Sequence, residues 1–208
     1  MHPLLTPDAT LLRDENNGTI IYLKGQKLSG ILESEKHFRE LRTKNNAAEI
    51  ATLFITVLRH EFRITDPRNE LVVTSVSTDD LGLTHVRFIQ VYQRVPIAYS
   101  EIIVHLDREN HVYLVNGRYI PTPESLNTRP EITPAEAKDI VSSDLQKDVS
   151  DALREPLELI IFPQSETGAR LAFRIEILMR VDEGWVYFID AVNGKILERR
   201  TLIQADHG

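Results

Sequence analysis

Hydrophobic residues between positions 47 and 63 recur at spacings of three and four, and this pattern predicts an amphipathic helix. Asn46 is a suitable N-cap for the helix, and Asp66-Pro67 marks the end of the segment. The residues expected on the apolar face are Ile50, Leu53, Phe54, Val57, Leu58 and Phe62.

Four strand-like runs follow this helix, at residues 71–76, 85–92, 97–106 and 112–120. The connections between the last three runs are short, which favours an antiparallel meander. Alternate residues of the third run are small or apolar, and we expect that face to pack under the helix. These residues are Ala98, Ser100, Ile102, Val104 and Leu106.

The same order of helix and strands recurs after a proline-rich stretch at residues 121–130. Thr133 followed by Pro134 and Glu136 predicts a helix start with a capping box. Asn193-Gly194 predicts a type I′ turn, in which both central residues have positive φ. The strand-like runs of this half are residues 157–162, 169–181, 185–190 and 195–203.

Composition and charge narrow the classes of function. Of the 208 residues, 42% are hydrophobic and 26% are charged, which is ordinary for a folded protein. The formal charge of −7 argues against a nucleic-acid partner, which requires clustered Lys and Arg. The absence of cysteine excludes disulfides, thiolate zinc sites and cysteine nucleophiles. No 18-residue apolar run predicts a membrane span, and the first residues lack the features of a signal peptide.

The sequence HEFRI at position 60 begins like the zinc motif H-E-x-x-H but lacks its second histidine. Zinc binding requires two histidines four residues apart on one helical face, and position 64 is Ile. We therefore interpret His60 and Glu61 as a solvated helix end. His105 and His111 flank one predicted turn, and we interpret them as surface residues. No catalytic residue and no metal site is predicted.

Two longer parts of the chain resemble the propeptide of thermolysin-like (vibriolysin-like) zinc metalloproteases. The stretch GLTHVRFIQVYQRVPIAYSEIIVHLD, followed by HVYLVNGRY, resembles the fungalysin/thermolysin propeptide (FTP) domain. The stretches TPAEAKDIV and WVYFIDAVNGKILERR resemble the PepSY domain. Arg94 stands where the FTP pattern usually has Gly, which takes positive φ at no cost. We therefore expect a different turn at Arg94.

The resemblance and the pattern together imply an α+β fold, with two tandem cystatin-like subdomains that each pack a helix on an antiparallel sheet. The segment 25–42 is mixed and polar, and we interpret it as a linker with a short helix. The expected organisation is an N-terminal strand and linker (1–46), an FTP domain (47–120), a linker (121–130), a PepSY domain (131–203) and a C-terminal tail (204–208).

The resemblance also implies a function. The chain would be the non-catalytic part of a secreted or periplasmic bacterial zymogen, acting as intramolecular chaperone and protease inhibitor. Its partner would be the protease catalytic domain, initially joined covalently, and zinc and calcium would belong to that domain alone. Arg94, Tyr99 and Glu101 are the implied interface residues. The alternative is a stand-alone secreted or periplasmic PepSY-type regulator acting in trans.

The implied inhibitory element is the C-terminal segment, which would run extended into the protease cleft. Its terminal carboxylate is a chemically suitable zinc ligand. The residues of this segment are Thr201, Leu202, Ile203, Gln204, Ala205, Asp206, His207 and Gly208.

Overall fold

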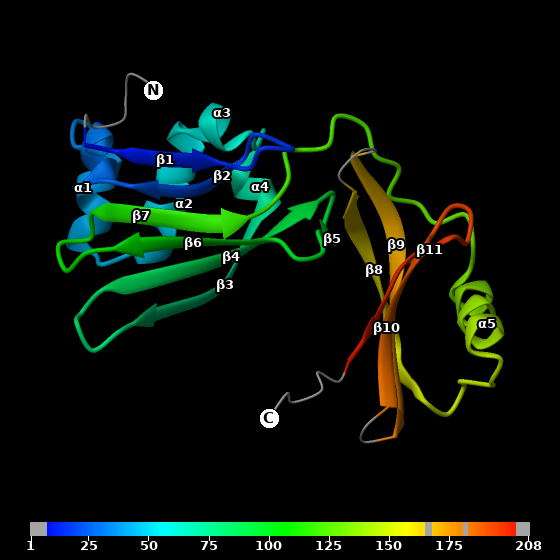
Figure 1. Cartoon of the computed structure of the whole chain (residues 1–208). Helices are drawn as coiled ribbons and strands as arrows, with labels where there is room; N and C mark the ends of the chain where they lie inside the picture. Colours follow the sequence, from blue (N-terminus) through cyan, green and yellow to red (C-terminus); the bar gives the residue numbers. More distant parts are fainter. Residues whose placement is uncertain (1–7, 165–167, 181–182, 203–208) are drawn as a thin grey trace. The chain divides into compact units, whose positions relative to one another are not determined.

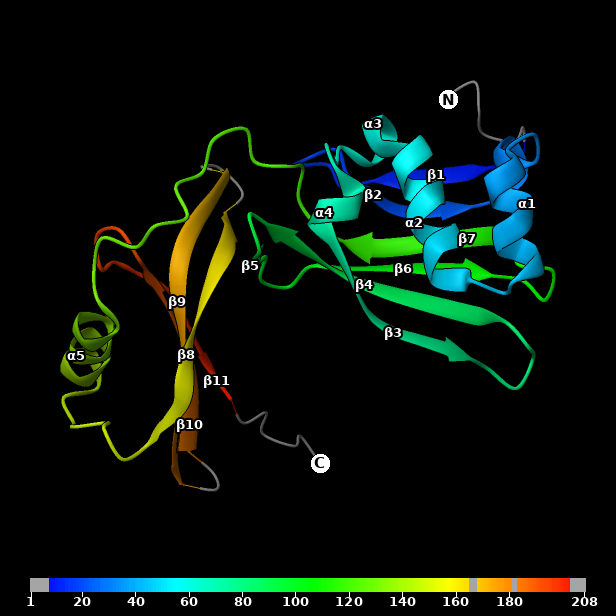
Figure 2. The same cartoon turned by 180° about the vertical axis from the view of Figure 1, so that it is seen from behind.

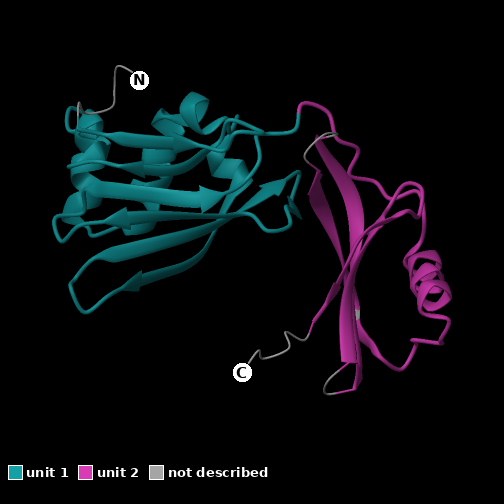
Figure 3. Cartoon of the chain, viewed as in Figure 1, with its two compact units in different colours: residues 1–123 teal, residues 124–208 magenta. Residues whose placement is uncertain are grey.

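The computed structural model describes residues 8–164, 168–180 and 183–202. It divides into two compact units, Met1–Pro123 and Glu124–Gly208 (Figure 3). Each unit combines an antiparallel sheet with helices (Figure 1). The α+β fold class is therefore confirmed.

In the first unit, the described residues form a seven-stranded sheet of order β1-β2-β7-β6-β4-β3, and β5 pairs with the end of β4. The pairings of this sheet are antiparallel, as the short connections predict. The strands are β1 (Thr10–Arg13), β2 (Ile20–Lys24), β3 (Leu71–Thr78), β4 (Thr84–Tyr92), β5 (Val95–Pro96), β6 (Glu101–Leu106) and β7 (Val112–Arg118).

Helices of the first unit lie against one face of this sheet, as Figure 2 shows for α1, α2 and α4. Buried side chains of β6 such as Ile102, Val104 and Leu106 join the helices in one hydrophobic core, as predicted. We call the opposite face of the sheet the outer face. The helices are η1 (Leu28–Leu32), α1 (Lys36–Thr43), α2 (Ala47–Val57), α3 (Arg59–Phe62) and α4 (Pro67–Glu70).

The helix predicted over residues 47–63 is divided. Asn46 caps its start by accepting the Glu49 N–H at 3.2 Å, as expected. The helix breaks at Leu58, whose ψ of 18° is no longer helical, and α3 follows. The break places Phe62 in the core, 6.3 Å from the ring of Tyr119.

The prediction of a linker with a short helix at residues 25–42 is partly wrong, because the short helix is present but the segment is not a linker. The segment forms η1 and α1, and four of its apolar side chains are buried in the core of the first unit. Leu28 and Leu32 of η1 are both buried, and Phe38 and Leu41 share one face of α1. The many polar residues around these positions cover the solvent side of two short helices.

In the second unit, the described residues form a four-stranded antiparallel sheet of order β11-β10-β9-β8. The predicted capping box is present, because Thr133 and Glu136 bond each other's backbone N–H groups. Tyr187 donates a 2.6 Å hydrogen bond from its hydroxyl to Asp144 of the helix, which ties the helix to the sheet. The elements are α5 (Pro134–Leu145), β8 (Leu153–Gln164), β9 (Gly168–Arg180), β10 (Glu183–Asp190) and β11 (Ile196–Thr201).

The predicted type I′ turn at Asn193-Gly194 is wrong. In the loop 191–195, which the structure describes fully, Gly194 alone has positive φ, at 74°. The loop is longer because Asp190 accepts the N–H groups of Val192 and Asn193, at 2.8 and 3.2 Å. Asp14 organises the loop between β1 and β2 through the same set of contacts. An aspartate at the strand end thus outweighs the Asn-Gly signal.

Candidate functional site

The turn between β4 and β5 adopts an unusual backbone conformation. Tyr92 pairs with Val95, so Gln93 and Arg94 form a two-residue hairpin turn. Both residues have positive φ, at 50° and 70°, which is the type I′ geometry. A non-glycine residue thus occupies the left-handed region at Arg94, and the expected difference from the usual FTP turn stays a prediction.

Tyr99 adds a third left-handed residue a short distance along the chain. Its φ is 60°, and the residue is 46% exposed. Positive φ is uncommon for a bulky residue and persists only where surrounding contacts enforce it. The segment 93–99 therefore concentrates backbone strain at the end of the sheet.

Two buried polar side chains hold this strained segment in place. The Ser100 hydroxyl donates to the Ile97 carbonyl at 2.8 Å and accepts the Gln90 N–H at 2.9 Å. The Gln90 side chain donates to the Ile120 carbonyl at 2.9 Å and accepts its N–H at 3.1 Å. Buried, fully paired polar groups of this kind rigidify their surroundings, so the hairpin has a fixed base.

Glu101 lies directly after this hairpin, on the outer face of the sheet. Its carboxylate accepts a 2.8 Å bond from Arg87 of β4, and both side chains are about half exposed. An exposed pair of this kind contributes little stability, about 0–1 kcal/mol. The structure thus brings Arg94 and Tyr99 into one hairpin and places Glu101 at its base.

The first two residues of the predicted inhibitory segment are part of the second unit's sheet. Thr201 pairs with Trp185, and the Leu202 N–H donates to the Gly184 carbonyl at 2.8 Å. Gly184 is tightly packed, since a Cβ there would lie 2.9 Å from the Ile177 carbonyl oxygen. Residues Ile203, Gln204, Ala205, Asp206, His207 and Gly208 lie outside the described residues.

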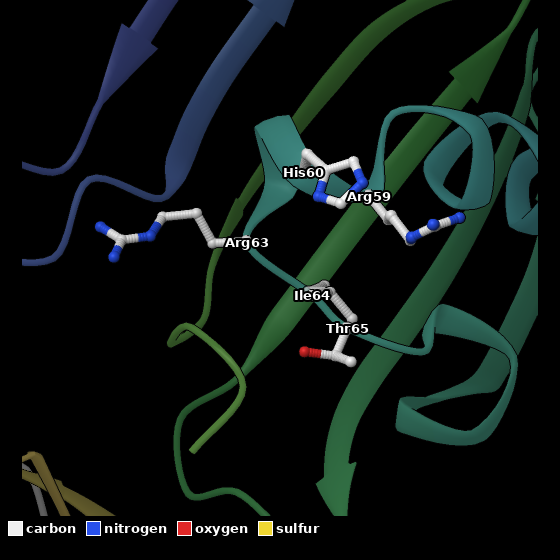
Figure 4. Close-up of a pocket in the computed structure, with 5 residues that line it drawn as sticks. All are labelled: Arg59, His60, Arg63, Ile64 and Thr65. Carbon is white, nitrogen blue, oxygen red and sulfur yellow. The ribbon is translucent and has the colours of Figure 1, made fainter. Parts of the chain in front are cut away.

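The zinc-motif fragment lies in α3 and the residues that follow it. His60 is exposed and lines a pocket of about 470 Å³ together with Arg59, Arg63, Ile64 and Thr65 (Figure 4). In Figure 4 the Arg63 side chain points away from His60, and it donates to the Asn17 carbonyl at 2.6 Å. This lining includes no carboxylate, so it does not provide the ligands of a zinc protease site.

Glu61 is engaged elsewhere, in an ion pair with Arg13 of β1. Arg13 also donates to the Glu61 carbonyl at 2.8 Å. Within the described ranges, no three His, Asp or Glu side chains converge in a way that could hold a metal ion. Glu61 therefore makes a structural contact with Arg13.

The prediction for the other two histidines is partly wrong. His111 is 3% exposed and packs 6.4 Å from the ring of Phe38, so it is not a surface residue. Burial lowers the pKa of His111, and the charge of Arg42 lowers it further, while Asp107 and Glu33 act in the opposite direction. His105 contacts His85 across β4 and β6, a pairing that the sequence analysis missed.

Comparison with known proteins places these features in a family context. Residues 69–119 match the model of the "Fungalysin/Thermolysin Propeptide Motif", and residues 131–200 match the "Peptidase propeptide and YPEB domain". The chain thus contains two consecutive regions that each match a propeptide family model. It resembles the propeptide of thermolysin-like proteases. The strained hairpin lies within the first matched domain, and Thr201 directly follows the second.

Curated relatives support this resemblance. A thermolysin of Alicyclobacillus acidocaldarius subsp. acidocaldarius is 30% identical over 145 residues, which cover 64% of this chain and 26% of the relative. A bacillolysin of Bacillus amyloliquefaciens is 28% identical over 149 residues, covering 67% of this chain and 28% of the relative. The chain thus spans about a quarter of the length of these relatives.

A solved structure, the Bacillus megaterium YpeB C-terminal domain, is also similar, at a TM-score of 0.36 and 17% identity. The match covers 77% of this chain and 65% of that one. None of the helices in the described part of the chain is long and apolar enough to cross a membrane.

Proposed function

We propose that this chain is the propeptide of a thermolysin-like metalloprotease, and that it acts as intramolecular chaperone and inhibitor of the protease. The observation that carries the proposal is the presence of both propeptide domains in one chain, at residues 69–119 and 131–200. The match to thermolysins and bacillolysins supports the same assignment. The chain itself contributes no catalytic group to this function.

The chaperone and inhibitor roles both follow from binding to the folded protease. A partner that binds the folded protease, but not its unfolded chain, stabilises the folded state by mass action. A covalent link raises the effective concentration of the partner into the millimolar range, so that modest contacts suffice before cleavage. The catalytic domain holds its own zinc and calcium, and the precursor is secreted or periplasmic.

Two parts of the chain make the inhibitory contacts in this proposal. The hairpin with Arg94 and Tyr99 is held rigid by Gln90 and Ser100, so it loses little entropy on binding. Glu101 lies beside it and supplies a charge at the rim of the interface. In this proposal, residues 203–208, which follow the last described residue of the second unit, occupy the substrate path of the protease cleft.

The first experiment reads the coding sequence downstream of codon 208. The proposal predicts an H-E-x-x-H motif within the next few hundred codons. The encoded catalytic domain is then assayed for inhibition by the chain, and by the chain shortened after Leu202. Shortening should weaken inhibition at least about tenfold, while Tyr99→Ala tests the hairpin separately. An unaffected protease would exclude the inhibitor role.

One observation favours a second candidate function. The family description of the second domain names YpeB as well as peptidase propeptides. The alternative is therefore a stand-alone, secreted or periplasmic PepSY-type regulator that binds its partner in trans. A stop codon after residue 208 would favour it, and capture of a partner other than a protease by the purified chain would establish it.

A further inference from the structure

The outer face of the first unit carries a row of four polar side chains that the propeptide role does not use. His85 of β4 and His105 of β6 lie directly opposite each other in the strand register. Their Nδ1 atoms are 2.7 Å apart. His85 Nε2 lies 3.2 Å from Asp79 Oδ2, and His105 Nε2 lies 2.7 Å from Asn116 Oδ1.

The contacts of this row fix the number of protons that it holds. Each of the three contacts needs one proton between its two heavy atoms. Asp79 and Asn116 present oxygen acceptors, so the Nε2 atoms of both histidines must carry hydrogen. A third proton lies between the two Nδ1 atoms. Two neutral imidazoles carry two protons together, so the complete row holds one extra proton, whose charge faces the Asp79 carboxylate.

A second extra proton disrupts the row. In the singly charged row, the Nδ1 of one histidine donates to the Nδ1 of the other. The second proton can bind only to the accepting Nδ1, and two N–H groups then face each other at a distance of 2.7 Å between the nitrogens. Burial lowers the pKa of His105, the hydrogen bond to Asn116 raises it, and the charges of His85 and Arg87 lower it again. The geometry therefore resists double protonation, and two linked imidazoles titrate as a coupled pair.

Neighbouring groups do not relieve this repulsion. Arg87 is already paired with Glu101 across β4 and β6. Ser77, which lies opposite His85 on β3, is uncharged. Burial raises the pKa of Tyr113, as do two nearby carboxylates, so Tyr113 stays neutral in acid. The charged or titratable groups around the two imidazoles are Asp79, Arg87, Glu101, Asp107 and Tyr113.

We propose that this row is a proton switch, which holds the β3–β4 hairpin against β6 while it carries one extra proton and releases it when a second extra proton binds in acid. Asp79 connects the row to the hairpin, because its Oδ1 also accepts the N–H groups of Leu81 and Leu83. The second proton creates electrostatic repulsion between His85 of β4 and His105 of β6. These residues lie at the end of the β4–β6 pairing that is nearest the turn between β3 and β4. The switch operates in the isolated chain, whatever its partner.

The test is an NMR titration of the whole chain from about pH 8 to about pH 5, which spans the ordinary histidine range. The ring nitrogens of both histidines are followed together with amide hydrogen exchange in β3 and β4. The proposal predicts two separated, coupled steps for His85 and His105. It also predicts that opening of the hairpin becomes about tenfold more frequent in acid, the factor that one pKa unit represents.

Variants separate this switch from other acid effects. His105→Gln removes the second protonation, and the acid-dependent exchange of β3 and β4 should fall by the part that this row contributes in the wild type. His37→Gln alters an exposed residue of α1 and should leave both signals unchanged. His111 is present in every variant and cancels in the comparison. Independent single-step titration of the two rings would overturn the proposal, as would equal acid-dependent exchange in the wild type and His105→Gln.

Discussion

Asp190 is the side chain on which the last hairpin of the second unit depends most. It is 2% exposed, and its Oδ1 accepts the N–H groups of Val192 and Asn193. The loop that it organises also accepts, through the Ala191 carbonyl, the N–H groups of Glu131 and Ile132 just before α5. Replacing Asp190 with Ala therefore disturbs both the hairpin and the start of the helix.

The magnitude follows from the two lost bonds. A hydrogen bond to a charged group contributes about 1.5–3 kcal/mol, and part of this loss is recovered where the freed N–H groups reach water. We expect Asp190→Ala to lower the free energy of unfolding of the second unit by about 2–4 kcal/mol. For a unit of this size, each kcal/mol shifts the melting temperature by about 4–8 °C. Asp190→Asn retains an acceptor oxygen and should lose less.

Urea unfolding followed by tryptophan fluorescence measures this effect selectively. Trp185 is the single tryptophan of the chain and lies on β10, the strand that leads into the loop. Asp14→Ala removes the same type of contact from the first unit and is the matched control. It should leave the Trp185 transition within about 0.5 kcal/mol. A shift of less than about 1 kcal/mol for Asp190→Ala, or an equal shift for Asp14→Ala, would refute the reasoning.

Three further predictions concern other contacts. Arg94→Gly should stabilise the β4–β5 turn by about 0.5–1 kcal/mol, because glycine takes positive φ without a steric cost; slower hydrogen exchange in β4 would show it, and faster exchange would contradict it. Tyr187→Phe removes the bond to Asp144 and should lower the Trp185 unfolding free energy by about 1–2 kcal/mol; an unchanged midpoint would contradict it. Because the pKa of His111 is lowered in the folded state, the unfolded chain binds more protons, and the first unit should lose stability as pH falls below about 6.5. His111→Gln should make the melting temperature less dependent on pH, and an unchanged dependence would contradict the prediction.

Local sequence patterns were sufficient to predict those features of the structure that depend only on residues close together in the chain. The capping box of Thr133 and Glu136 needs only residues three apart, and the structure contains it. The Asn46 cap is equally local and is also present. The sheet of the first unit follows its short connections, so its antiparallel order was predictable.

Features that depend on distant residues could not be predicted in this way. The contact between His85 and His105 exists only because β4 and β6 pair in one register, which no local pattern fixes. The core positions of Leu28 and Phe38 were missed because the spacing signal of a short helix covers only one or two turns. The type of turn at Asn193 was predicted wrongly because Asp190, three residues earlier, accepts hydrogen bonds from N–H groups of the loop and so makes the loop longer than two residues.

The proposed function requires that the chain binds and blocks a thermolysin-like catalytic domain. The most direct test adds the purified chain to a zinc-loaded thermolysin-like catalytic domain and follows peptide hydrolysis as a function of chain concentration. We expect saturable inhibition at a one-to-one ratio, which the chain shortened after Leu202 reproduces only weakly. Full activity of the protease at a large excess of the intact chain would contradict it.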